Sequence, residues 1–115
     1  NLMLASMIPE AELGWAEMMR AEARARLRHL LHPGTILCLP TTPFPAPAKG
    51  LAISEQEPVR QRISVLASHG GLAGVPQVSL PGAAVDGLPV GLSIVGALGT
   101  DVELVAVARA MEEGT

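Results

Sequence analysis

Two runs of residues, 75–81 and 88–95, alternate between apolar side chains and polar or small ones. This two-residue period is typical of β-strands whose two faces meet different surroundings. The positions expected to share the apolar face are Val78, Leu80, Val90, Leu92 and Ile94. The pattern therefore predicts a β-hairpin whose strands have unequal faces.

The residues between the two runs predict how the strands are joined. Asp86 and Gly87 favour a type I′ turn, in which both central residues need a positive φ. A strict two-residue loop would place Leu80 opposite Ser93 and would mix the apolar and polar faces. We therefore expect a β-bulge near Gly82, or a longer loop.

Apolar residues at three- and four-residue spacing predict three helices. The first runs from Pro9 to a stop at Pro33-Gly34, and its apolar stripe consists of Trp15, Met19, Ala23, Leu27, Leu30 and Leu31. The polar side of this helix is rich in arginine, namely Arg20, Arg24, Arg26 and Arg28. These side chains form either a solvated face or an anion-binding face.

The two later helices are shorter. The second is expected over residues 58–69, ends at Gly70-Gly71, and buries Val59, Ile63, Leu66 and Ala67. Thr100 and Glu103 have the spacing of a capping box, which predicts the start of the third helix. That helix is expected to end before Gly114 and to bury Leu104, Val105, Ala108 and Met111.

Residues 35–39 are nearly all apolar, which predicts a strand buried on both faces of a parallel or mixed sheet. Cys38, between two leucines, is expected to be an inert core residue. The four prolines of residues 40–47 exclude helix and sheet interior. This segment is predicted to be a rigid loop at the carboxyl end of the strand, where open α/β sheets commonly bind ligands.

Composition narrows the possible functions. The chain has 115 residues, of which 49% are apolar, and this is enough for the core of one domain. A net charge of −3 and an aromatic content of 2% argue against nucleic-acid binding. No apolar run approaches the roughly 20 residues that span a bilayer. With a single cysteine and no signal-peptide pattern, the chain is expected to be cytoplasmic.

Familiar catalytic and metal-binding patterns do not fit this sequence. The Gly-Leu-Ser-Ile-Val-Gly segment around Ser93 is one residue longer than a nucleophile elbow and lies in a predicted strand. His29 and His32 have the spacing of metal ligands on a helix, but no third ligand accompanies them. Lys49, the single lysine, is expected to be exposed in a loop. We therefore predict neither a metal site nor a cofactor.

Four segments, in their order and spacing, resemble the C-terminal portion of enzymes of the amidase signature family. They are residues 39–47 (Leu-Pro-Thr-Thr-Pro-Phe-Pro-Ala-Pro), residues 72–81 (Leu-Ala-Gly-Val-Pro-Gln-Val-Ser-Leu-Pro), residues 87–96 (Gly-Leu-Pro-Val-Gly-Leu-Ser-Ile-Val-Gly) and Asp101 at the start of the last helix. The resemblance implies the C-terminal part of an α/β/α fold, with a mixed sheet, a β-hairpin and about three flanking helices. Residues 1–115 are then expected to be a single segment, the C-terminal portion of an amidase domain.

The resemblance also implies an activity. Enzymes of this family hydrolyse amides with a serine, a cis-serine and a lysine. This chain has no Ser-Ser pair, and Lys49 has the wrong sequence context for the catalytic lysine. The catalytic residues are therefore expected to lie outside the chain, which alone should be inactive. A small carboxamide is the implied substrate, and the chain is expected to self-associate or to pack against the N-terminal portion of such an enzyme.

Five polar residues are candidates for a substrate pocket, because their segments border the substrate cleft in the family that the chain resembles. They are Thr41, Thr42, Ser64, Ser68 and His69. Two other interpretations remain open: a non-catalytic α/β assembly or regulatory module, and the glutamine amidotransferase A-subunit branch of the same family. Ser64 lies about where glutamine-using members carry an aspartate, which favours a general amidase.

Overall fold

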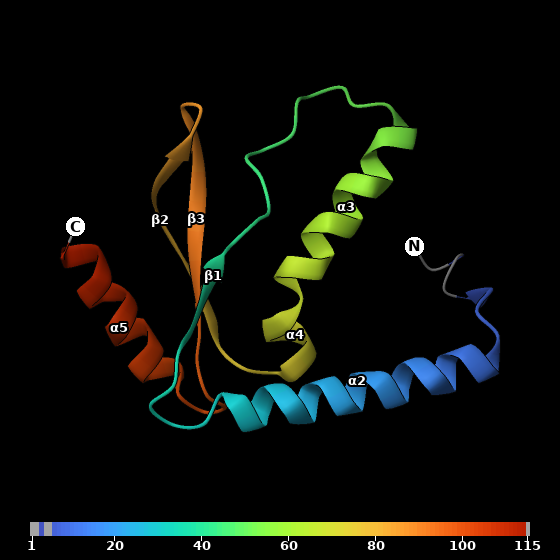
Figure 1. The fold of residues 1–115 in the computed structure, drawn as a ribbon, viewed down its shortest axis with the longest axis horizontal. Coiled ribbons are helices and arrows are strands. Elements are labelled where there is room, and N and C mark those ends of the chain that lie inside the picture. Colours follow the sequence, from blue (N-terminus) through green and yellow to red (C-terminus); the bar gives the residue numbers. More distant parts are fainter. Residues whose placement is uncertain (1–2, 4–5, 115) are drawn as a thin grey trace.

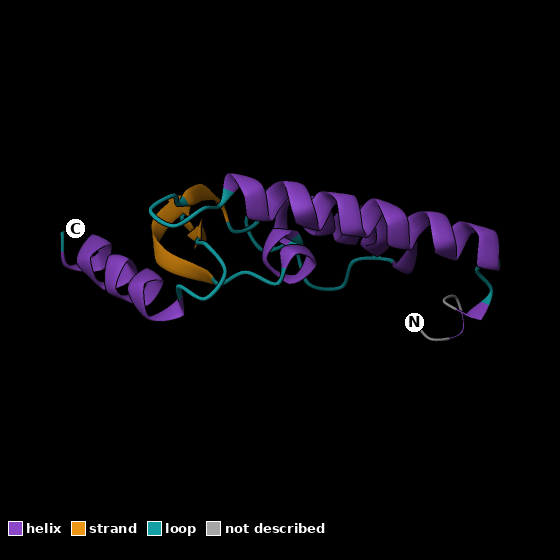
Figure 2. Ribbon diagram, turned by 90° about the horizontal axis from the view of Figure 1, so that it is seen from below, coloured by secondary structure: helices purple, strands orange, loops and turns teal. Residues whose placement is uncertain are grey.

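Three strands and four helices make up the part of the chain that the computed structural model describes, which is residue 3 and residues 6–114. The elements follow in the order α2 (Glu10–Leu30), β1 (Leu37–Pro40), α3 (Ile53–Ala67), α4 (His69–Ala73), β2 (Gln77–Val85), β3 (Leu88–Val95) and α5 (Asp101–Glu113). The strands form one sheet in the order β1-β3-β2. Helix α5 lies on one side of this sheet, and α2 and α4 lie on the other (Figure 1, Figure 2).

The sheet is antiparallel throughout the described residues, so the expected parallel or mixed sheet is wrong for this chain. β1 is an edge strand that pairs with β3 alone. Helix α5 packs on β2 and β3, so β1 lies outside the area that α5 covers. Cys38, opposite Ile94 on the α5 side of the sheet, is therefore exposed, and the prediction that it is a core residue is also wrong. Leu37, on the other face opposite Val95, is exposed as well.

The hairpin of β2 and β3 confirms the prediction from the alternating pattern. Asp86 and Gly87 have φ values of 51° and 77°, both positive as the predicted turn requires. The pairing shifts between Leu80, which lies opposite Leu92, and Ala83, which lies opposite Val90. This is the expected bulge. It places apolar residues opposite apolar residues instead of mixing the faces.

The two faces of the hairpin contribute to two separate cores. On one face, Leu80 and Ile94 pack against Leu104 and Ala108 of α5. On the other face, Val95 packs against Leu31 after α2, Ala73 of α4 and Val75. Ile94 and Val95 are neighbours in sequence and both fully buried, because successive strand residues point to opposite sides of the sheet.

Helix α2 occupies the predicted segment, but only its C-terminal end is packed. Trp15 and Met19 are 62% and 43% exposed, whereas Ala23 and Leu27 are half-buried and Leu31 is 4% exposed. The N-terminal half extends beyond α4 and the sheet (Figure 1, Figure 2). The predicted apolar stripe is therefore buried only in its last turns. The described helices include none long and apolar enough to cross a membrane.

Helices α3 and α4 replace the single helix predicted over residues 58–69. α3 begins five residues earlier and contains Pro58, and none of its residues is fully buried. Gly70 and Gly71 belong to α4, so they do not end the helix. Gly74 ends it with a φ of 68°, and its N–H donates to the Gly70 carbonyl oxygen at 2.8 Å. A left-handed glycine after the last turn is a common helix stop.

Helix α5 confirms the predicted position and most of the buried face. Leu104 and Ala108 are buried, but Val105 is 50% exposed, contrary to the prediction. The capping box does not form, since the Thr100 hydroxyl donates to the Ala97 carbonyl oxygen at 2.7 Å and caps no helix N–H. Gly114 stands at the C-cap, as expected.

Candidate functional site

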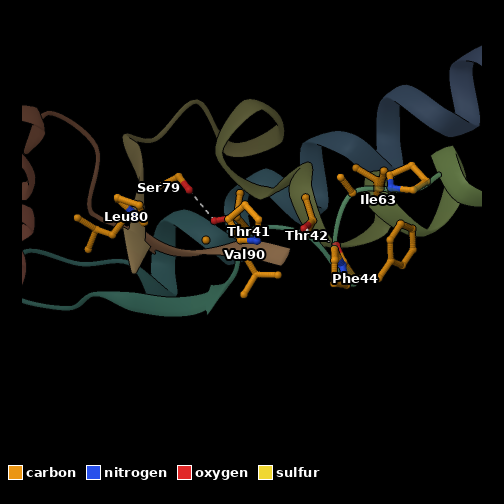
Figure 3. Close-up of a pocket in the computed structure, with 13 residues that line it drawn as sticks. Thr41, Thr42, Phe44, Ile63, Ser79, Leu80 and Val90 are labelled. Atoms are coloured by element: carbon orange, nitrogen blue, oxygen red, sulfur yellow. Dashed lines mark hydrogen bonds between the residues drawn. The ribbon is translucent and has the colours of Figure 1, made fainter. Parts of the chain in front are cut away.

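A cavity of about 430 Å³ lies where the proline-rich loop meets the sheet and α3 (Figure 3). Its walls are Thr41, Thr42 and residues 44–47 of the loop, Ile63 of α3, residues 79–81 of β2 and residues 89–91 of β3. This volume falls within the range of about 300–1,000 Å³ that is typical of small-molecule sites. The lining residues are mostly apolar and none is charged, so the site suits a small uncharged ligand better than an ion.

The polar side chains that line this cavity are the hydroxyls of Thr41, Thr42 and Ser79, and Thr41 is hydrogen-bonded to Ser79 and to the buried Ser93 behind it. Thr41 Oγ1 lies 2.7 Å from Ser79 Oγ and 2.8 Å from Ser93 Oγ. The Thr41 backbone N–H donates to the Gly91 carbonyl oxygen at 2.9 Å, which holds the start of the loop against β3. Ser93 is fully buried, while Ser79 is exposed. We call Thr41, Ser79 and Ser93 the hydroxyl cluster.

The register of the hairpin explains how this cluster assembles. The bulge sets Ser79 directly opposite Ser93, on the face of the sheet away from α5. Gly91 lies on the same face, two residues before Ser93. A Cβ atom on Gly91 would stand 2.7 Å from both Ser79 Oγ and Thr41 Oγ1. Glycine at this position therefore leaves the space that the two hydroxyls occupy.

Contacts within the loop and with α3 fix the far wall of the cavity. The Thr42 hydroxyl donates to the Phe44 carbonyl oxygen at 2.9 Å. The Arg62 guanidinium carbon lies 4.9 Å from the centroid of the Phe44 ring, a cation–π contact between α3 and the loop. Phe44 and Ile63 lie together at one end of the cavity (Figure 3). The cavity therefore depends on the loop and α3 keeping their relative position.

The five candidate pocket residues fall into two groups. Thr41 and Thr42 line the cavity. Ser64, Ser68 and His69 are not among its lining residues. The Ser68 hydroxyl donates to the Ser64 carbonyl oxygen, and His69 Nδ1 lies 2.7 Å from the Leu66 carbonyl oxygen. Ser68 and His69 thus bond to different backbone groups and not to one another, so they do not form a nucleophile–base pair in this structure.

Two residues of the cluster, Ser79 and Ser93, were not among the sequence candidates. Their shared face was already visible in the alternation of the hairpin, and the expected bulge allows them to pair. Their contact with Thr41 could not be predicted from this alternation, because Thr41 lies 38 residues before Ser79 and 52 before Ser93.

The arginines of α2 lie in different surroundings. Arg26 is exposed and its Nη2 lies 2.7 Å from Glu22 Oε1, as a solvated face predicts. Arg24 and Arg28 instead approach Gly74, and Arg28 Nε donates to the Ala73 carbonyl oxygen at 2.9 Å. The described part of the chain contains no group of three His, Cys, Asp or Glu residues that could hold a metal ion. Lys49 is exposed in its loop, as expected.

Comparison with known proteins shows similarity along the whole chain. It is 33% identical over 115 residues to the A subunit of the glutamyl-tRNA(Gln) amidotransferase of Thermus thermophilus, which is all of this chain and 24% of that protein. It is 40% identical over 85 residues to amidase 1 of Oryza sativa subsp. japonica, which is 74% of this chain and 20% of that protein. The chain thus spans about a fifth to a quarter of the length of these relatives. A search of protein-family models found no match.

Solved structures give the same result for the fold. The crystal structure of an amidase matches 97% of this chain with a TM-score of 0.77 and 30% identity, and the match covers 27% of that amidase. The structure of the A subunit of the glutamyl-tRNA(Gln) amidotransferase of Thermotoga maritima matches 92% of this chain, with a TM-score of 0.77 and 26% identity. Sequence and structure together confirm the resemblance seen in the four segments, and the chain belongs to the amidase signature family as a portion of such a protein.

Proposed function

We propose that this chain is the C-terminal portion of an amide hydrolase that acts on a small carboxamide. The observation that carries the proposal is the similarity to an amidase structure over 97% of the chain. An uncharged cavity with a few hydroxyl groups agrees with such a substrate, because an amide needs hydrogen-bond partners and an apolar acyl group needs apolar walls. Thr41 and Thr42 are then substrate-pocket residues. A pocket role for Ser64, Ser68 and His69 stays a prediction, as does a cytoplasmic location.

In this proposal the chemistry belongs to residues outside the chain. A serine would attack the amide carbonyl carbon, and a second serine and a lysine would take up its proton. Backbone N–H groups would hold the negative charge of the tetrahedral intermediate. The chain would supply a wall of the pocket, and the shape of that wall would select the acyl group. One methylene in such a pocket changes discrimination by roughly 1–3 kcal/mol.

The proposal is tested on the complete gene product that contains this chain. We expect release of ammonia from aliphatic or aromatic carboxamides, with kcat/KM changing severalfold to a hundredfold for each methylene added to the acyl group. Activity on an acyl series is measured beside L-glutamine as a competing amide. Lack of hydrolysis of every amide would contradict the proposal and favour a non-catalytic assembly or regulatory module.

The second candidate is the glutamine amidotransferase A-subunit branch of the family. It is favoured by the 33% identity, over the complete chain, to the protein of this branch from Thermus thermophilus. Ser64, an exposed residue of α3, lies about where glutamine-using members of the family carry an aspartate, and this difference counts against the branch. Hydrolysis of L-glutamine in preference to simple carboxamides would assign the protein to this branch.

The shape of the chain supports a place within a larger assembly. Its accessible surface is 8515 Å², whereas a compact monomer of 11.9 kDa exposes about 6,000 Å². Its radius of gyration is 16.8 Å, against about 13 Å for a compact domain of similar length. Large apolar side chains such as Trp15 and Met18 are more than half exposed.

We therefore expect the isolated chain to self-associate, because exposed apolar surface and an unpaired edge strand both favour pairing. Light scattering should give a mass above that of the 11.9 kDa monomer, and an apolar dye should bind. The complete gene product at the same concentration serves as the control and should bind less dye per mole. A monodisperse monomer that binds no dye would contradict this expectation.

A further inference from the structure

The hydrogens of the hydroxyl cluster can be counted. Thr41 Oγ1 makes one hydrogen bond with Ser79 Oγ and one with Ser93 Oγ. Each hydroxyl has one donor hydrogen and can accept two hydrogen bonds. Two bonds among three hydroxyls therefore use two of the three hydrogens. One hydrogen is left over within the cluster.

Burial decides which hydroxyl keeps the spare hydrogen. Ser93 is fully buried, and Thr41 is its hydrogen-bond partner within the described residues. Because buried donors are rarely left unsatisfied, Ser93 donates to Thr41. Thr41 then donates to Ser79, since a hydroxyl that accepts one hydrogen bond is polarised to donate the next. The spare hydrogen belongs to Ser79, which is exposed and lines the cavity.

The surroundings of Ser79 limit what it can bind. Ser79 and Thr41 point toward each other, with Leu80 and Val90 beside them (Figure 3). The lining residues carry no charge and include Ile63 and Phe44, so the cavity offers mainly apolar contacts. The nearby Arg62 guanidinium faces the Phe44 ring. A free hydroxyl hydrogen in such a site complements a neutral acceptor, and a carbonyl oxygen is the simplest one.

We propose that the Ser79 hydroxyl donates a hydrogen bond to the carbonyl oxygen of an uncharged ligand in this cavity, and that Thr41 and Ser93 act as positioning residues for it. The inference rests on the proposed function in one respect: the ligand there is the carboxamide substrate. Gly91 is part of the arrangement, because a side chain there would displace both Thr41 Oγ1 and Ser79 Oγ. No bond is broken in this step, and Ser79 only binds and orients.

The test measures binding of acetophenone and ethylbenzene to the complete gene product. The two probes are similar in size, but only acetophenone has a carbonyl oxygen, and neither has an amide bond to cleave. Ser79→Ala should weaken acetophenone binding about three- to tenfold, the size of one neutral hydrogen bond, and should change ethylbenzene binding less than about twofold. Ser79→Thr keeps a hydroxyl and should restore most of the acetophenone affinity.

Two further variants test whether the effect depends on the hydroxyl cluster. Ser93→Ala removes the buried donor and should weaken acetophenone more than ethylbenzene, by a smaller factor than Ser79→Ala. Ser54→Ala, an exposed serine of α3 outside the cavity, is the matched control and should bind both probes like the parent. Melting curves accompany each variant. Since Ser79 is exposed, its replacement should leave the fold intact.

The outcomes distinguish this inference from the proposed function. If acetophenone does not bind, or if Ser79→Ala weakens both probes equally or neither, the assignment of Ser79 is overturned. Ammonia release from carboxamides is measured on the same preparations. A carbonyl-specific loss in Ser79→Ala without any hydrolysis overturns the proposed function and leaves the Ser79 inference standing. Hydrolysis of carboxamides without the carbonyl-specific loss in Ser79→Ala overturns the Ser79 inference and leaves the proposed function standing.

Discussion

Replacing Leu80 with alanine is expected to lower the free energy of unfolding by about 2–5 kcal/mol, the usual cost of a leucine-sized cavity in a core. Leu80 is 8% exposed and packs with Ile94, Leu104 and Ala108 between the sheet and α5. Removing its side chain would take contacts from both layers, and close packing limits how far they can relax. Urea denaturation followed by circular dichroism measures the loss.

Leu92 provides the matched control for this substitution. It is directly opposite Leu80 in the hairpin, yet it is 38% exposed and is not part of the core beneath α5. Leu92→Ala is therefore expected to cost about 1 kcal/mol or less. The sequence pattern treats both leucines as equal members of one apolar face. Equal losses for the two variants would mean that α5 does not cover the sheet as the structure has it.

The features predicted correctly depend on residues close together in sequence. The turn at Asp86-Gly87 follows from two adjacent residues that accept positive φ. The bulge follows from the requirement that Leu80 should not lie opposite Ser93, which needs only the two strands of one hairpin. Helix α2 likewise follows from a periodic pattern that ends at Pro33 and Gly34. Local geometry decides all three.

Most of the errors arise where distant parts of the chain decide burial, and one arises from a competing hydrogen bond close in sequence. An apolar run at 35–39 predicts a strand, but its sequence cannot tell that this strand lies at the edge of an antiparallel sheet. The stripe of α2 is apolar from Trp15 onward, yet its residues are partly buried only from Ala23 onward. Thr100 has the right spacing for a capping box, but its hydroxyl donates to the Ala97 carbonyl oxygen instead. In each case a nearby or missing neighbour overrides the pattern.

The candidate site shows the same division. Thr41 and Thr42 could be proposed because their loop resembles a segment that borders the substrate cleft in the amidase signature family. Ser79 and Ser93 look like ordinary sheet serines until the bulge places them opposite each other and Thr41 reaches both. Gly91 gives the one local hint, since a glycine inside a strand commonly marks a close approach of other groups.

The 115-residue chain on its own is expected to release no ammonia from benzamide or hexanamide, even where the complete gene product does. An amidase needs a nucleophile with a base in hydrogen-bond reach, and loss of such a set lowers kcat by about a millionfold in a serine hydrolase. The hydroxyls of Thr41, Ser79 and Ser93 are bonded to one another and not to an amine or imidazole. Among the residues that the structure describes, no hydrogen bond joins these hydroxyls to a base that could activate them.

The remaining candidate nucleophiles, Cys38 and Ser68, are excluded for separate reasons. Cys38 is exposed on the edge strand, and no hydrogen bond joins it to a base among the described residues. Ser68 and His69 each bond to a backbone carbonyl oxygen. The assay compares the pure chain with Cys38→Ala and Ser68→Ala at equal concentration, so that a trace of a contaminating hydrolase gives the same signal in all three. Turnover by the chain that either substitution abolishes would show that a catalytic group lies within these residues. The proposal that the catalytic residues lie outside the chain would then be wrong.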